Sequence, residues 1–155
     1  MKKLELILIT GAIIGLLLVL FNTPFDSLIA SVFFTTLSCL YYFFGFALFN
    51  NIPALKIFKA DSYKGVGTLR ILIAIGTGIA LSILTTGFMF TILNYLAAKT
   101  LLVVGLVFVT IIIILALMRN AQEKNQFYKN IILRCLVFLI IAVTLLLAPG
   151  HLFAA

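Results

Sequence analysis

The chain has 155 residues, of which 65% are hydrophobic and 10% charged, and its formal net charge is +7. Soluble domains carry about 25% charged residues, so this composition leaves too few polar residues for a water-facing domain and predicts an integral membrane protein. The positive charge would suggest nucleic-acid binding in a soluble protein, but here the basic residues lie between apolar runs, which favours a role in membrane orientation and no nucleic-acid partner.

The first apolar segment is Leu4–Phe21, which follows Lys2 and Lys3 as the core of a signal peptide would. No small-residue cleavage site follows it, and a second apolar segment, Ser27–Phe49, begins almost at once. We therefore interpret the first segment as an uncleaved membrane helix.

The stretch from Leu69 to Met118 is too long for one crossing, because about 20 apolar residues already span the hydrocarbon core. It predicts two helices, Leu69–Phe90 and Thr100–Met118, joined by a turn within Thr91–Thr100. A fifth segment covers Ile131–Ala148. The prediction is a single all-α membrane domain over residues 1–155, a bundle of about five crossings.

The basic residues predict the orientation of this bundle. Of the 11 lysines and arginines, all except Lys99 fall on one side if the segments alternate in direction. The positive-inside rule then places the N-terminus in the cytoplasm and the C-terminus outside. We expect a multi-pass protein of the bacterial inner membrane.

A short helix at about residues 53–60 is predicted after the second segment, because Pro53 follows two asparagines and Lys56 and Lys59 share one face. Such a helix would lie in the headgroup region, with Lys56, Lys59 and Lys64 near anionic lipid. Specific docking of lipid or of a partner is the alternative, but the composition favours a plain connector.

Small and hydroxylated residues recur at helical spacing in three segments. Close backbone approach and hydroxyl bonds hold membrane bundles together, so these faces predict helix packing. The alternative is a polar lining for a pore or groove. The residues concerned are Gly11 and Gly15 in the first segment, Ser27, Ser31, Thr35, Ser38, Tyr42 and Gly45 in the second, and Ala74, Thr77, Gly78 and Thr85 in the third.

Candidates for catalysis are few. We interpret Glu5 as an interfacial anchor beside Lys2 and Lys3, and His151 has no companion ligand for a metal. The sequence offers no paired carboxylates and no nucleophile with a base. We therefore predict no catalytic residues, no cofactor, no metal site and no enzyme activity.

The run from Phe58 to Arg70, followed by Ile75–Ser82, resembles a family of small uncharacterised bacterial multi-spanning inner-membrane proteins, over residues 1–148. The hairpin of that family is similar in turn to the two-helix subunit of the gliding-motility and type IX secretion motor. Here residues 94–97 read Asn-Tyr-Leu-Ala, without the His, Trp and Pro of the family's turn. Since we also expect no carboxylate within the membrane, the resemblance does not imply motor activity.

These features favour a non-catalytic membrane subunit or scaffold that packs into a homo-oligomer or a larger membrane complex. The alternative is a small passive channel, pore or carrier for a neutral or hydrophobic solute. A lipid-modifying enzyme would need a partner to supply its reactive groups.

Overall fold

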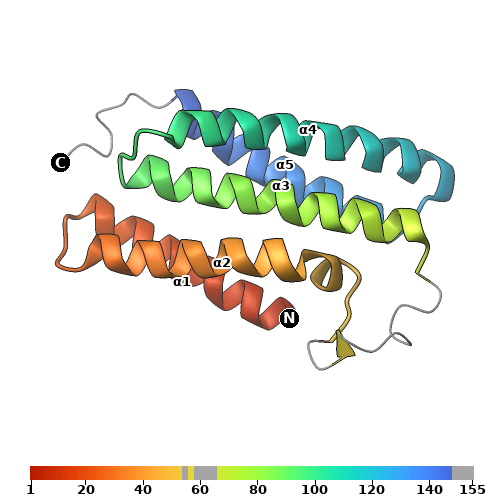
Figure 1. The fold of residues 1–155 in the computed structure, drawn as a ribbon, viewed down its shortest axis with the longest axis horizontal. Helices are drawn as coiled ribbons and strands as arrows, with labels where there is room; N and C mark the ends of the chain where they lie inside the picture. Colours follow the sequence, from red (N-terminus) through yellow and green to blue (C-terminus); the bar gives the residue numbers. More distant parts are fainter. Residues whose placement is uncertain (54–55, 58–65, 148–155) are drawn as a thin grey trace.

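The computed structural model of the chain describes residues 1–53, 56–57 and 66–147, which form five α-helices and contain no strand. The helices are α1 (Lys2–Leu20), α2 (Asp26–Phe49), α3 (Thr68–Ile92), α4 (Ala98–Glu123) and α5 (Gln126–Leu147). All five run along the length of an elongated bundle (Figure 1), and each is long and apolar enough to cross a membrane. The predicted all-helical bundle with five such segments is confirmed.

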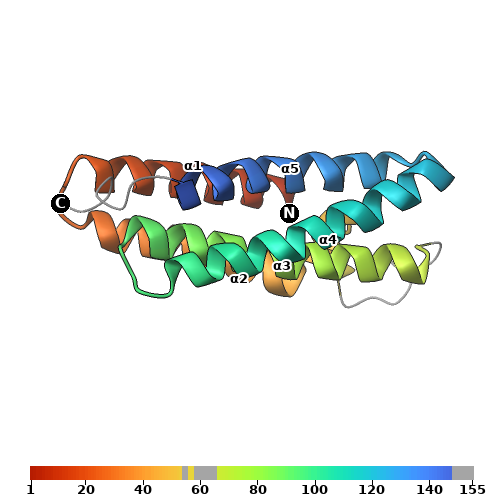
Figure 2. The ribbon, with the colours of Figure 1, turned by 90° about the horizontal axis from the view of Figure 1, so that it is seen from above.

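Figure 2 shows two layers, with α1 and α5 in one and α2 and α3 in the other, while α4 runs obliquely from beside α3 toward α5. The pairs in extensive contact are α1 with α2, α2 with α3, α3 with α4, and α5 with both α4 and α3. Helix α3 is therefore central, and its Ala74, Leu81 and Leu84 are fully buried. Helices α1 and α5 lie in the same layer but make no extensive contact with each other.

Three helices end in the same way, with an asparagine in the left-handed conformation. Asn22, Asn51 and Asn94 follow α1, α2 and α3 by two residues and have φ of 49°, 57° and 56°. After α2, for example, the Ile52 N–H donates to the Ala47 carbonyl at 2.8 Å. This Schellman arrangement satisfies carbonyl groups that the helix itself leaves free. The asparagines therefore fix where the chain reverses.

Helices α4 and α5 extend beyond the predicted segments. Helix α4 runs five residues past Met118, and α5 starts five residues before Ile131. Polar residues propagate a helix as well as apolar ones do, so the apolar run marks only its membrane-compatible part. The break comes at Lys124, whose φ is 45°, and at Asn125, whose Oδ1 accepts the Phe127 N–H at 3.0 Å.

Basic side chains collect at one end of the bundle, which we call the basic end. There α1, α3 and α5 begin and α2 and α4 finish (Figure 1). Lys99, in the first turn of α4, lies at the opposite end. The described basic residues of the basic end are Lys2, Lys3, Lys56, Arg70, Arg119, Lys124 and Lys129.

The predicted short helix at residues 53–60 lies mostly outside the described residues. Of its described part, Lys56 donates its N–H to the Pro53 carbonyl at 2.9 Å, and its side chain is exposed. Ile57 is buried and packs with Ala47 and Ile52. Lys59 and Lys64, predicted to contact lipid headgroups, are not among the described residues.

Candidate functional site

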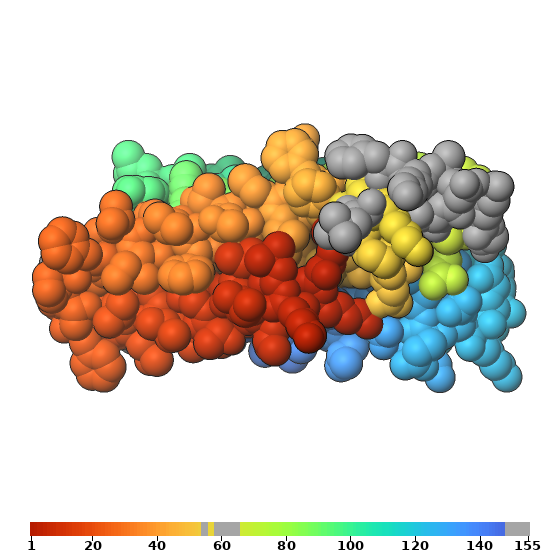
Figure 3. Space-filling view, turned by 90° about the horizontal axis from the view of Figure 1, so that it is seen from below, coloured from red at the N-terminus to blue at the C-terminus, as the bar shows by residue number. Residues whose placement is uncertain are grey.

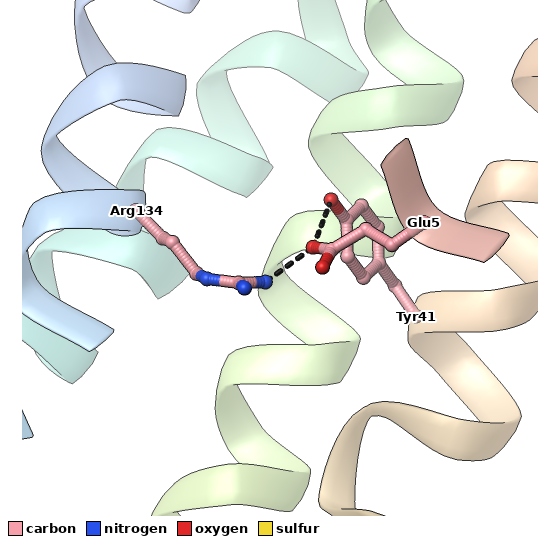
Figure 4. Close-up of polar contacts among 3 residues, drawn as sticks. All are labelled: Glu5, Tyr41 and Arg134. Carbon is pink, nitrogen blue, oxygen red and sulfur yellow. Dashed lines mark hydrogen bonds and ion pairs between the residues drawn. The ribbon is translucent and has the colours of Figure 1, made fainter. Parts of the chain in front are cut away.

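Glu5 is the one acidic side chain buried in the described part of the chain, with 5% of its surface exposed. The Tyr41 hydroxyl of α2 donates to Glu5 Oε1 at 3.1 Å, and Arg134 of α5 forms an ion pair with the same oxygen (Figure 4). One carboxylate thus joins three helices. The interpretation of Glu5 as an interfacial anchor beside Lys2 and Lys3 is wrong.

The position of Glu5 follows from the buried face of α1. That face begins at Glu5 and continues through Leu8, Gly11, Ala12 and Gly15, with the three- and four-residue steps of a helix packed on one side. Lys2, one turn before Glu5, and Lys3 are both exposed. The spacing could have assigned Glu5 to the packed side, but a carboxylate so close to the N-terminus is usually placed at the membrane surface.

Arg134 lies within α5 rather than in the loop that precedes it. It is eight residues past Gln126, which corresponds to about 12 Å along the helix. Figure 1 shows the matching offset, because the N-terminus lies well inside the ends of α3 and α4. The Arg134 guanidinium also lies 5.4 Å from the centre of the Phe49 ring. Its charge is thus met by a carboxylate and an aromatic face.

This cluster is suited to holding helices together. An isolated buried charge is very unfavourable, whereas a paired and hydrogen-bonded one is tolerated. The Glu5 carboxylate has one cation and one hydroxyl donor, each from a different helix. Since α1 and α5 lack an extensive contact, the ion pair is a polar link between the two helices of that layer.

A second polar cluster joins α2 to α3. Ser38 Oγ lies 3.1 Å from the Ser82 carbonyl oxygen, 2.8 Å from Ser82 Oγ and 3.0 Å from Thr86 Oγ1. All three hydroxyl groups are buried or half-buried. Ser82 and Thr86 were not predicted, and the partners of Ser38 could only be found once α2 and α3 were placed together.

Glycines bring the same two helices into backbone contact. A Cβ on Gly45 would lie 2.7 Å from the Gly78 Cα, and one on Gly78 would lie 2.5 Å from the Tyr41 carbonyl oxygen. On α1, a Cβ on Gly15 would come within 2.8 Å of the Ala30 Cα. These predicted glycines lie where backbones pack closely.

The structure distributes the remaining predicted face residues differently. Ala74, Thr77 and Thr85 are buried in α3, and the two threonine hydroxyls donate to carbonyls of their own helix. Gly11 is buried against the Phe33 ring. The α2 face is not buried as a whole: Ser31 is half-buried, and Ser27, Thr35 and Tyr42 are exposed.

Three hollows line the gap between α1 and α5. The first, about 260 Å³, lies at the basic end and is lined by Lys2, Asn51, Asn130 and Arg134 among others. The second, about 430 Å³, contains the Glu5 cluster. The third, also about 430 Å³, has fourteen lining residues of which thirteen are apolar, the exception being Thr85. In Figure 3 the start of α1 (red) lies between the segment after α2 (yellow) and α5 (blue).

Fold and composition define a bundle of five helices, each suited to crossing a membrane. No protein-family model, curated protein or solved structure matches the chain. The family resemblance drawn from Phe58–Arg70 stays a prediction, and residues 58–65 of that run lie outside the described part. In the described ranges, no three His, Cys, Asp or Glu side chains gather as metal ligands would.

Proposed function

We propose that the chain is a non-catalytic integral membrane subunit or scaffold that acts through contacts with copies of itself or with another membrane protein. The observation that supports this most directly is its apolar outer surface. Large apolar side chains are exposed along α1, α4 and α5, for example Leu6, Ile14, Val107, Ile114 and Ile140, each about half exposed or more. Such a surface would promote aggregation in water, whereas in a bilayer it can contact lipid or partner helices.

The same proposal includes the orientation and the compartment. The basic end would face the cytoplasm of a bacterium, and the opposite end, with Lys99, would face outward across the inner membrane. Helix order supports this, because five antiparallel helices bring nearly all described basic residues to one end.

A non-catalytic role is supported by how the inner polar groups are used. Ser38 bonds to Ser82 and Thr86, and the Thr77 hydroxyl donates to a carbonyl of its own helix. Glu5 is paired with Arg134. These groups bond to one another, and they are not arranged as a nucleophile beside a base.

The alternative of a passive channel or carrier receives less support. Its path was expected along the hydroxyl faces, but Ser38 of α2 faces Ser82 and Thr86 of α3 directly. Those hydroxyls therefore line the contact between two helices. The largely apolar hollow beside Thr85 would suit only a hydrophobic molecule.

The mass of the particle in lipid nanodiscs tests the proposal. One chain has a mass of 17.1 kDa, so a scaffold should give a multiple of this mass or retain a second membrane protein in fixed ratio after extraction from native membranes. A chain that is monomeric and without such a partner, and that speeds release of a hydrophobic dye from liposomes, would contradict the scaffold and favour the carrier.

A further inference from the structure

The three hollows between α1 and α5 adjoin one another along the bundle, and together we call them the groove. Lys2, Leu133 and Arg134 line both the first and the second hollow. The second and third hollows share three other wall residues, which are Ile9, Val137 and Phe138. The groove therefore leads from charged and amide side chains at the basic end to walls that are apolar except for Thr85.

The polar part of the groove suits an anion. Lys2 and Arg134 supply two positive charges and Glu5 one negative charge, which leaves this part net positive. A guanidinium has five N–H donors, and the described hydrogen bonds of Arg134 use one of them, to Glu5. Asn51 and Asn130 add exposed amide groups on the wall of the first hollow.

The apolar part runs to the far end of the bundle, because Leu20 and Ile92, the last residues of α1 and α3, line the third hollow. On α5 the wall continues for eleven residues from Arg134 to Leu145, which is about 16 Å at the rise of an α-helix. One acyl chain needs about 15 Å to cross half of a hydrocarbon core of about 30 Å. A molecule with its charged end at Arg134 would therefore have apolar wall beside it along the whole of one acyl chain.

We propose that the groove between α1 and α5 binds an anionic phospholipid, with the phosphate at Lys2 and Arg134 and one acyl chain against the apolar walls. This site goes beyond the scaffold role and depends only on the membrane residence included in it. The succession of a cationic end and a long apolar wall matches a molecule with an anionic head and a hydrocarbon tail.

Two pairs of matched variants test the two halves of the site. Lys2→Gln is compared with Lys3→Gln, because both lysines are exposed and only Lys2 lines the groove. Ile141→Trp is compared with Ile140→Trp, because both residues are exposed and only Ile141 lines the apolar hollow. Each pair changes charge or bulk equally, so a general effect would appear in both members.

The measurement is native mass spectrometry of detergent-purified full-length chain titrated with phosphatidylglycerol or phosphatidylcholine. We expect phosphatidylglycerol to bind more tightly than phosphatidylcholine. Lys2→Gln should weaken phosphatidylglycerol binding about fivefold, and Ile141→Trp should weaken the binding of both lipids. The affinities of Lys3→Gln and Ile140→Trp should stay within twofold of the parent. Equal losses within either pair, or equal binding of the two lipids, would overturn the site.

The same spectra report the number of chains in each particle, which separates this inference from the proposed function. An oligomer whose lipid binding is indifferent to Lys2→Gln and Ile141→Trp would leave the scaffold standing and remove the lipid site. If Ile141→Trp dissociates the oligomer without changing lipid binding, a second copy occupies the groove and the lipid proposal is wrong.

Discussion

Replacing Gly78 by alanine should separate α2 from α3. The added Cβ would lie 2.5 Å from the Tyr41 carbonyl oxygen and 3.2 Å from the Gly45 Cα, where ordinary contact begins at 3.4 Å. Both neighbours are helix backbone, which cannot rotate away as a side chain can. Overpacking of this kind costs about 1–3 kcal/mol, and it would also stretch the hydrogen bonds of Ser38 one turn away.

Gly76→Ala is the matched control in the same helix. Its Cβ would meet only the Ile112 side chain, whose Cδ1 lies 2.8 Å away and can move. Both substitutions gain the same helix propensity, about 0.5–1 kcal/mol, so this gain cancels when the two variants are compared. The remaining difference is the cost of forcing two backbones apart.

The assay uses the buried thiol of Cys135, which is fully buried and free, as an internal reporter. In a Cys39→Ser background, a thiol-reactive dye becomes fluorescent as the purified protein unfolds on heating. We expect Gly78→Ala to melt roughly 3–10 °C below Gly76→Ala, given that 1 kcal/mol shifts Tm by a few degrees in a chain of this size. Equal melting temperatures would refute the claim that α2 and α3 are in backbone contact.

Three further predictions use the same protein. Arg134→Met should lower the free energy of unfolding by about 3 kcal/mol, because it leaves the Glu5 carboxylate buried without a cation. Adding Glu5→Met should recover much of this loss, as measured by chemical unfolding. If the effects of the two substitutions simply add, the ion pair is contradicted. Ser38→Ala should lower the free energy of unfolding by about 1 kcal/mol, because it removes the hydrogen bonds of Ser38 to α3. The control is Thr36→Ala, which should melt like the parent because the exposed Thr36 hydroxyl donates to Val32 of its own helix. Equal losses in the two variants would mean that the Ser38 cluster does not stabilise the contact between α2 and α3. In a cysteine-free background, Leu96→Cys should react with an impermeant thiol reagent added to spheroplasts and Lys124→Cys should not, and the reverse pattern would invert the proposed orientation.

The number of helices and most of their limits follow from local patterns in the amino-acid sequence. The largely apolar stretch from Leu69 to Met118 exceeds one bilayer crossing, so two helices were required, and α3 and α4 cover it. Local signals also placed the reversals, since Asn22, Asn51 and Asn94 adopt the left-handed conformation that ends a helix. The helix limits and the chain reversals depend on residues that are neighbours along the chain, so they can be predicted from the sequence.

The contacts between side chains of different helices, in contrast, become visible only in the folded bundle. Glu5 and Arg134 are 129 residues apart, and each taken alone is typical of a membrane surface. Their pairing depends on α1 and α5 sharing a layer and on how far each helix is offset along the bundle. The hydroxyl faces could not be predicted fully for the same reason. Ser38 is buried, whereas Tyr42, one turn further along α2, is exposed. In a membrane both lipid and neighbouring helices are apolar, so the type of a side chain does not reveal which of them it will face.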